Sequence, residues 1–235
     1  MLNITLFFKI FTIHLNLIIH NIMVYIKKLF KYGYLEIEGD PEDIWFVSDL
    51  HMFHTNIIKL CNRPFSDIDD MTKTLVDNWN RVVKEDDIVF NLGDFCWSES
   101  PVIWSKLIGK LNGYQVLIKG NHDHPKTLQK LSEQYKLIER HSGDRLEVTR
   151  MDKLFLIRER LELRYNDERY LLDHYPQVHY SGQYHGMKHF FGHTHEKPFE
   201  YTNNHYNVCV ERNEYRPMSL QELKNNIQNR VLVES

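Results

Sequence analysis

Five short apolar segments of this chain each end in side chains that can bind a metal ion or move a proton. The segments are residues 44–47, 88–90, 116–118, 170–172 and 189–191. Continuous apolar runs of this length are typical of strands buried on both faces. Ligand sites in open α/β sheets form at the carboxyl ends of such strands. The pattern therefore predicts an α/β fold in which the ends of five strands meet at one site.

The side chains that follow these segments are nitrogen and oxygen donors without a thiolate. In chain order they are Asp49 with His51, Asp94, Asn121 with His122, His174, and His193 with His195. This donor set favours manganese, iron, zinc or nickel over a closed structural zinc site. Alternate side chains of an extended backbone point to the same side, so we expect both members of Asp-x-His and His-x-His to reach one ion. A carboxylate such as Asp94 can bridge two ions about 3.5–4 Å apart.

The rest of the chain supplies predicted helices and a second group of strands. Helices are expected to begin at Ser66, Ser100, Pro125 and Ser219. Strands are expected at residues 34–37 and 206–210. From residue 145 onward, apolar residues alternate with charged ones, which is typical of half-buried antiparallel strands. Asn166-Asp167 suits a hairpin turn between two of them.

Composition restricts the partners and the compartment. The chain has 235 residues and a formal net charge of −3, so it lacks the overall basic charge of many nucleic-acid-binding proteins. Its three cysteines, Cys61, Cys96 and Cys209, lie far apart and form no C-x-x-C pair. They indicate neither a zinc ribbon nor a disulfide framework, and they favour a reducing, cytoplasmic location. We expect one domain over residues 24–235.

Residues 1–23 form an apolar extension that polar residues interrupt. Lys9, His14, Asn16, His20 and Asn21 lie within it. A lysine at the centre of a spanning helix costs about 2.5–3.5 kcal/mol, against roughly 0.3–0.6 kcal/mol gained per large aliphatic residue. Stable membrane insertion is therefore not expected. Our first interpretation is a spurious extension before a true start at Met23, the second a membrane-associated helix, and the third a signal peptide.

The ordered set of motifs resembles the calcineurin-like metallophosphoesterase family. The matching pieces are Asp49-Leu50-His51, Gly93-Asp94, Gly120-Asn121-His122-Asp123, His174 and Gly192-His193-Thr194-His195. The segments at residues 54–58 and 61–65 are similar to a compact microbial or phage branch of that family. The resemblance implies a four-layer αββα sandwich, in which two mixed β-sheets pack face to face with helices outside.

The resemblance also implies roles for individual residues. It assigns Asp49, His51, Asp94 and His195 to one divalent ion, and Asp94, Asn121, His174 and His193 to a second. His122 resembles the residue that protonates the leaving group, with Asp123 as its orienting partner, while a metal-bridging hydroxide attacks the phosphoester. Manganese is the first expectation for the metal. Trp97 stands where purple acid phosphatases have a tyrosine, so an iron–tyrosinate centre is not expected.

Several other residues could bind substrate or could have only a structural role. Arg63 could clamp a phosphate through its guanidinium group, or it could pair with a nearby carboxylate, and the sequence favours neither. His54 and Asn121 are further candidates for substrate binding. We interpret Trp97, Trp104, Tyr175 and Tyr184 as core or rim packing, with stacking on a base as the alternative.

The sequence favours an enzyme that hydrolyses a small or flexible phosphoester, as a phosphomonoesterase or a phosphodiesterase. Nucleotides are among the expected substrates. The first alternative is a nuclease, but family nucleases carry a DNA-capping domain after the last motif, and about forty residues follow His195 here. The second alternative is a binding scaffold without metal. Loss of ligands would indicate a scaffold, and this chain retains them all.

Overall fold

The computed structural model describes residues 26–29, 34–134, 139–142, 145–148, 153–197 and 203–234. Three of the predicted apolar runs form the centre of a five-stranded sheet, in the order β13, β3, β4, β5, β8. These strands are β13 (Met218–Ser219), β3 (Ile44–Val47), β4 (Ile88–Asn91), β5 (Tyr114–Ile118) and β8 (Leu154–Arg158). β3, β4, β5 and β8 run parallel, so their carboxyl ends lie at one edge.

The other two runs lie in a six-stranded mixed sheet, in the order β1, β2, β9, β10, β11, β12. Its strands are β1 (Ile26–Leu29), β2 (Tyr34–Ile37), β9 (Arg160–Tyr165), β10 (Glu168–Asp173), β11 (Lys188–Phe191) and β12 (His205–Asn207). β9 and β10 form the predicted antiparallel hairpin, and Asn166 in its turn has a φ of 52°. β10, β11 and β12 are parallel.

The two sheets pack face to face through alternate residues of their strands. Phe46 of β3 stacks on Phe90 of β4 at 5.2 Å between ring centroids, and Phe190 of β11 meets Phe46 edge-on at 4.9 Å. The intervening residues Trp45 and Val89 point to the opposite face of the five-stranded sheet, where they join a second apolar cluster. Alternate residues of β3 and β4 thus enter two different apolar clusters, which is why neither face of these strands is polar.

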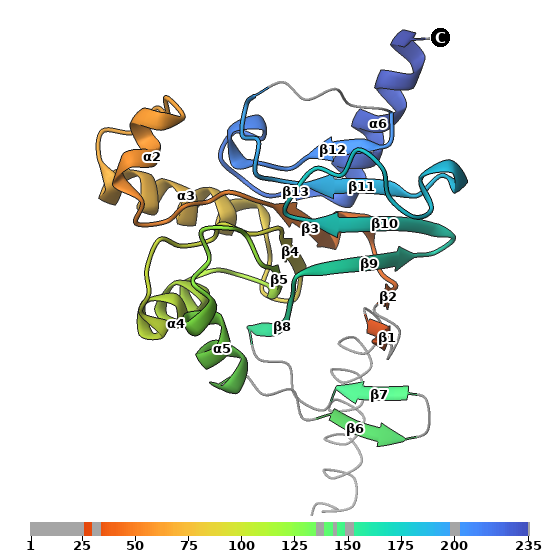
Figure 1. Ribbon diagram of the computed structural model, residues 1–235, viewed down its shortest axis with the longest axis horizontal. Helices are drawn as coiled ribbons and strands as arrows, with labels where there is room; N and C mark the ends of the chain where they lie inside the picture. Colours follow the sequence, from red (N-terminus) through yellow and green to blue (C-terminus); the bar gives the residue numbers. More distant parts are fainter. Residues whose placement is uncertain are drawn as a thin grey trace, which may run out of the picture.

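Helices cover that opposite face of the five-stranded sheet (Figure 1). They are α3 (Ile68–Val82), α4 (Pro101–Lys110) and α5 (Pro125–Gln134), and they bury Trp79, Trp104 and Leu131 against the sheet. The short helix α2 (Thr55–Leu60) precedes them, and α6 (Leu220–Glu234) packs against β13 and β3. The predicted fold, two mixed sheets flanked by helices, is confirmed.

The short 3-10 helices and a small hairpin complete the described chain. They are η1 (Pro41–Asp43), η2 (Gln183–His185), η3 (Val210–Arg212), and the hairpin of β6 (Glu139–Ser142) with β7 (Arg145–Val148). Across the described ranges, no helix is both long and apolar enough to cross a membrane. Our interpretation of residues 1–23 concerns a segment outside the described residues.

Four local predictions differ from the structure. Asp67, not Ser66, caps α3, because its carboxylate accepts from the backbone N–H groups of Asp69 and Asp70. β8 pairs parallel with β5, whereas its alternating pattern had predicted an antiparallel strand. The strand predicted at residues 206–210 spans His205–Asn207 and gives way to η3 at Val210. Ser219 belongs to β13 and caps α6 from there, since its hydroxyl accepts from the N–H of Glu222.

Candidate metal centre

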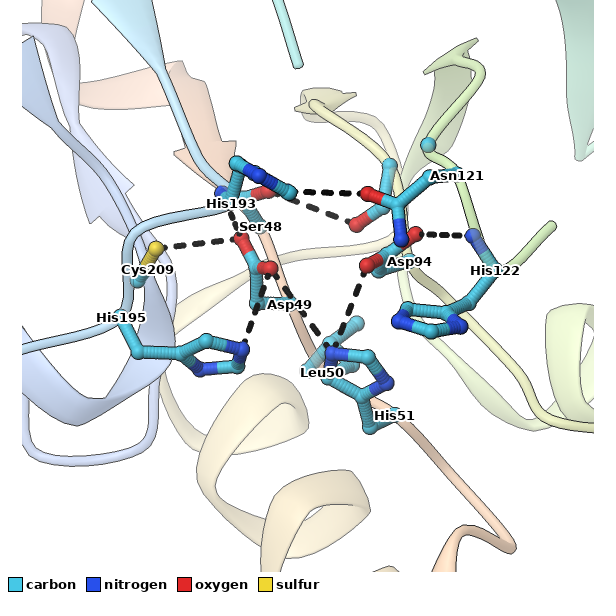
Figure 2. A network of polar contacts seen from close by, with 12 residues as sticks. Ser48, Asp49, Leu50, His51, Asp94, Asn121, His122, His193, His195 and Cys209 are labelled. Carbon is cyan, nitrogen blue, oxygen red and sulfur yellow. Dashed lines mark hydrogen bonds and ion pairs between the residues drawn. The ribbon is translucent and has the colours of Figure 1, made fainter. Parts of the chain in front are cut away.

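The loops after β3, β4, β5, β10 and β11 meet at one edge of the sandwich, as the sequence predicted. Backbone hydrogen bonds hold them together: Asp49 N–H donates to Gly93 O at 2.9 Å, His51 N–H to Asp94 O at 2.8 Å, and Gly192 N–H to His174 O at 2.9 Å. Figure 2 shows the resulting ring of carboxylate, amide and imidazole side chains. The first two bonds join loops of the five-stranded sheet, and the third joins loops of the six-stranded sheet. The two sheets are linked by the N–H of Ser48, which donates to Val208 O at 3.0 Å, and by the N–H of His193, which donates to Asp49 Oδ2 at 2.8 Å.

Asp49 lies at the centre of the first group of ligands. Its Oδ1 is 3.8 Å from His51 Nε2 and 3.6 Å from His195 Nε2. Its Oδ2 accepts hydrogen bonds from the backbone N–H of His193 and the thiol of Cys209. Oδ1 of Asp49 and Nε2 of His51 are buried and have no hydrogen-bond partner. Buried polar atoms without a partner are costly, and a cation between them would satisfy both.

Asp94 lies between the two groups of ligands. Its Oδ2 is 3.5 Å from His51 Nε2 and also 3.5 Å from His174 Nε2. Its Oδ1 accepts a hydrogen bond from the backbone N–H of His122 at 2.8 Å. One carboxylate oxygen thus faces imidazole nitrogens from both groups, which is the arrangement that a bridging ligand requires.

The second group is built around Asn121. Its Oδ1 lies 2.9 Å from His174 Nε2 and 2.9 Å from His193 Nδ1. Nδ1 of His174 is 2.8 Å from the carbonyl oxygen of Leu92, to which it can donate. That bond would leave the lone pair on Nε2, the atom that faces Asp94 and Asn121. A second hydrogen bond of this kind commonly orients a metal-binding histidine.

Buried carboxylates and imidazoles crowd together at the site and shift one another's pKa values. Burial raises the pKa of Asp94 to about 7, and the nearby charges of Asp49 and Asp123 add to the rise. Burial also acts to raise the pKa of Asp49, but the neighbouring imidazoles of His51, His174 and His195 outweigh it and lower that pKa. Two crowded, buried carboxylates beside four imidazoles are a suitable environment for divalent cations.

The backbone at the site is not extended, contrary to our expectation for the Asp-x-His and His-x-His motifs. Asp49 and His51 have φ angles of 60° and 50°, and His193 and His195 have 69° and 50°. Both members of each motif reach the site because the chain turns sharply at each ligand. Such left-handed conformations are uncommon outside glycine and cluster at functional sites. The close packing also requires glycine, since a Cβ on Gly120 would lie 2.1 Å from Asp94 Oδ1.

The hydrogen bonds of Asp123 go to backbone groups and not to His122, whose orienting partner it was predicted to be. Asp123 is buried and accepts hydrogen bonds from the backbone N–H groups of Asp94, Phe95 and Gly120 at 2.8–2.9 Å. These three bonds fix the loop after β4 against the loop after β5. The imidazole of His122 makes no hydrogen bond to a carboxylate among the described residues. It lies exposed beside Asp94 (Figure 2), and burial of part of the ring lowers its pKa.

For Arg63, the sequence left open whether the side chain binds a phosphate or pairs with a carboxylate. Its guanidinium group is buried and donates to the carbonyl oxygens of Asp49 and Leu50 at 2.6 and 2.9 Å. It also forms a salt bridge with Glu211 at 2.7 Å. Its donors are therefore used inside the protein, and the structure supports the alternative of carboxylate pairing.

Two residues near the ligands gave no signal that we recognised in the sequence. Glu211 accepts from Nδ1 of His195 at 2.8 Å, so it orients that ring with Nε2 toward Asp49. Cys209 donates its thiol to Asp49 Oδ2. Glu211 follows the last strand segment in the same way as the predicted ligands follow theirs, and this position could have drawn attention to it.

His54 remains a candidate for substrate binding. Its ring is buried, with Nδ1 3.4 Å from Nδ1 of His51, and burial lowers its pKa to about 4. It also stacks on the indole of Trp97 at 3.9 Å between centroids.

Comparisons with known proteins agree with this geometry. Residues 43–205 match the calcineurin-like phosphoesterase family. The chain is 36% identical over 183 residues to an uncharacterized protein of Methanocaldococcus jannaschii, which covers 75% of this chain and 86% of that protein. It is 36% identical over 83 residues to the gene 66 protein of Mycobacterium phage L5, covering 34% of this chain and 40% of that protein. A crystal structure of a protein of unknown function from Aquifex aeolicus shares the fold, with a TM-score of 0.57 and 23% identity over 77% of this chain and 97% of that one.

Proposed function

The chain belongs to the calcineurin-like phosphoesterase family, and from this we propose that it is a hydrolase of phosphoesters that works with two divalent metal ions. Asp49, His51 and His195 would hold one ion, Asn121, His174 and His193 the other, and Asp94 would contact both. Manganese is our first choice of metal, with iron, zinc and nickel as alternatives that suit the same donors. The substrate would be a small or flexible phosphoester.

The observation that carries the proposal is the position of Asp94 Oδ2. It lies 3.5 Å from one imidazole nitrogen of each group, while the facing ligand atoms of Asp49 and His51 are buried without partners. If Asp49 and His51 had only a structural role, we would expect those two atoms to form hydrogen bonds within the protein. Two ions in such a site would lower the pKa of a water between them and stabilise negative charge on a phosphoryl group.

The residues of the chain supply the remaining parts of the reaction. His122 would donate a proton to the oxygen of the departing alcohol, because its ring is exposed next to Asp94 and its backbone is fixed by the bond to Asp94 Oδ1. Glu211 and Leu92 would hold the rings of His195 and His174 in the ligand orientation. Asp123 and Arg63 would hold the loops that carry the ligands.

A metal-dependent activity screen tests the proposal. The full chain, stripped of metal and reloaded with Mn²⁺, Fe²⁺, Zn²⁺ or Ni²⁺, would be assayed on mononucleotides, cyclic nucleotides and bis-p-nitrophenyl phosphate. We expect metal-dependent hydrolysis of at least one of them. Asp94→Ala should lose more activity than the roughly 10- to 100-fold that follows loss of an outer-shell partner. His195→Ala serves as the matched variant, because it removes a ligand of one ion only.

The alternatives give different results in the same screen. A binding scaffold would cleave none of these substrates with any metal, which would contradict the proposal. With single-stranded DNA and RNA added to the screen, a nuclease would cleave these in preference to mononucleotides, which would contradict the proposed preference for small esters.

A further inference from the structure

Trp97 is exposed at the rim of the site, unlike the other three tryptophans of the chain. Its relative exposure is 48%, whereas Trp45, Trp79 and Trp104 are buried. Its backbone is fixed, because its N–H donates to Met52 O at 2.8 Å and Met52 N–H donates to Phe95 O at 3.0 Å. The backbone of Trp97 therefore has a defined position, while a large part of its side chain is open to solvent.

The neighbours of Trp97 connect it with the reacting groups. His54 stacks on one indole face at 3.9 Å, with an angle of 8° between the ring planes. The ring of His122 lies 4.9 Å away between centroids, tilted by 47°. Because His54 covers one face, the exposed surface of Trp97 belongs to its other face and its edges. That surface adjoins the residue to which we assign protonation of the leaving group.

We propose that Trp97 is the stacking surface for the base of a nucleotide substrate, and that the nucleoside is the leaving group. The inference rests on the proposed function and specifies its substrate class. A leaving group protonated by His122 must extend past that ring, and the exposed indole lies there. Flat aromatic rings stack favourably on tryptophan, and stacking of this kind accepts every base.

The inferred reaction is an ordinary hydrolysis. With adenosine 5′-phosphate, the oxygen of water bonds to phosphorus, the bond between phosphorus and the 5′ oxygen breaks, and that oxygen receives a proton from His122. The water releases a proton to solvent, from which His122 regains its own. Adenosine and inorganic phosphate are the products. The base takes no part in the chemistry, so its removal should affect binding and not the reacting bond.

A pair of substrates that differ only in the base tests the inference. Adenosine 5′-phosphate and ribose 5-phosphate share the same leaving oxygen, and their phosphate methyl esters form a second pair in case the enzyme prefers diesters. For the metal-loaded wild type, we expect a higher kcat/KM for the compound with the base. Trp97→Ala should reduce that preference roughly 5- to 100-fold, and Trp97→Phe should retain most of it. Tyr184→Ala alters an aromatic residue of η2 that is 87% exposed and serves as the matched control.

Tryptophan fluorescence gives a readout that does not depend on turnover. Because Trp97 is the exposed one of the four tryptophans, adenosine 5′-phosphate should quench the emission of the wild type and ribose 5-phosphate should not. An equal loss of kcat/KM for both compounds in Trp97→Ala, or an absence of selective quenching, would overturn the inference. If no ester is hydrolysed with any metal, the proposed function fails, and the quenching result still decides whether Trp97 binds the base.

Discussion

Asp123 is a buried carboxylate that fixes two loops of the site through hydrogen bonds to their backbone. Its two oxygens accept three backbone N–H groups from the loops after β4 and β5. The first loop carries Asp94, and the second carries Asn121 and His122. A rigid relation between these loops sets the distance between the two groups of ligands.

Replacement of Asp123 by asparagine should therefore destabilise the fold and weaken metal binding together. The amide NH₂ group would face a backbone N–H in either orientation, and a buried donor left without a partner costs about 1–3 kcal/mol. Urea unfolding and metal titration of Asp123→Asn would measure both effects. Normal stability combined with slow turnover would instead restore the role of Asp123 as an orienting partner of His122.

The general-acid role of His122 predicts a dependence on the leaving group. His122→Asn should retain both metal ions and lower turnover of a nucleoside ester by about 10²–10⁴. The loss should be smaller for a p-nitrophenyl ester, since p-nitrophenolate needs little protonation to depart. Steady-state kinetics on both esters would check this. Equal losses would indicate that His122 stabilises the phosphoryl oxygens, and unchanged turnover would exclude it from catalysis.

At the scale of elements, the strands that carry the site could be predicted because each contains a continuous apolar run that polar residues follow. β3, β4, β5, β10 and β11 lie where the sequence placed them, and each is followed by the expected ligand residues. β8 was misassigned because Leu154 and Leu156 alternate with other residues, and alternation alone does not distinguish a parallel strand at a sheet edge from an antiparallel one.

The contacts of Arg63 and Asp123 are ones that a single sequence does not reveal. Arg63 and Asp123 both lie in motifs whose side chains can bind ions or transfer protons. Their partners in the structure are instead backbone groups of other loops and, for Arg63, the carboxylate of Glu211, 148 residues away. Such contacts depend on tertiary structure. Glu211 was missed for the same reason, because its role depends on contacts with His195 and Arg63.

His189 of β11 is buried and holds the segment between β10 and β11 through a hydrogen bond to Gln177. Its environment predicts that the free energy of unfolding depends on pH. Nε2 of His189 accepts from the backbone N–H of Gln177 at 3.0 Å, and its Nδ1 is 3.1 Å from Leu171 O, so the ring must be neutral with its proton on Nδ1. Burial lowers the pKa of His189 to about 4, and the charge of His205 adds to this lowering.

Because the folded pKa lies below the unfolded value, the contribution of neutral His189 is complete above pH 6.5 and is lost as the pH falls toward 4. The loss should approach about 3 kcal/mol in the free energy of unfolding. Urea unfolding of the wild type and of His189→Gln between pH 7 and 4 would measure it. The wild type should lose more stability than the variant, and parallel curves would contradict the assignment.

At the scale of the whole molecule, every described strand and every proposed ligand lies after residue 25. β1 starts at Ile26, and the proposed ligands come from residues 49–195. We therefore predict that a chain starting at Met23 has the same unfolding midpoint, metal content and specific activity as the full chain. Thermal unfolding and the phosphoester assay would check this. An insoluble or inactive shorter chain would show that the first residues contribute to the fold or to a partner surface.

We propose that Asp94 binds two metal ions where the loops of the two sheets meet. The most direct measurement is the anomalous scattering from crystals of the full chain grown with Mn²⁺. We predict two peaks that share Asp94, one within coordination distance of Asp49, His51 and His195, and the other within that distance of Asn121, His174 and His193. A single peak, or two peaks of which either lacks contact with Asp94, would contradict the claim.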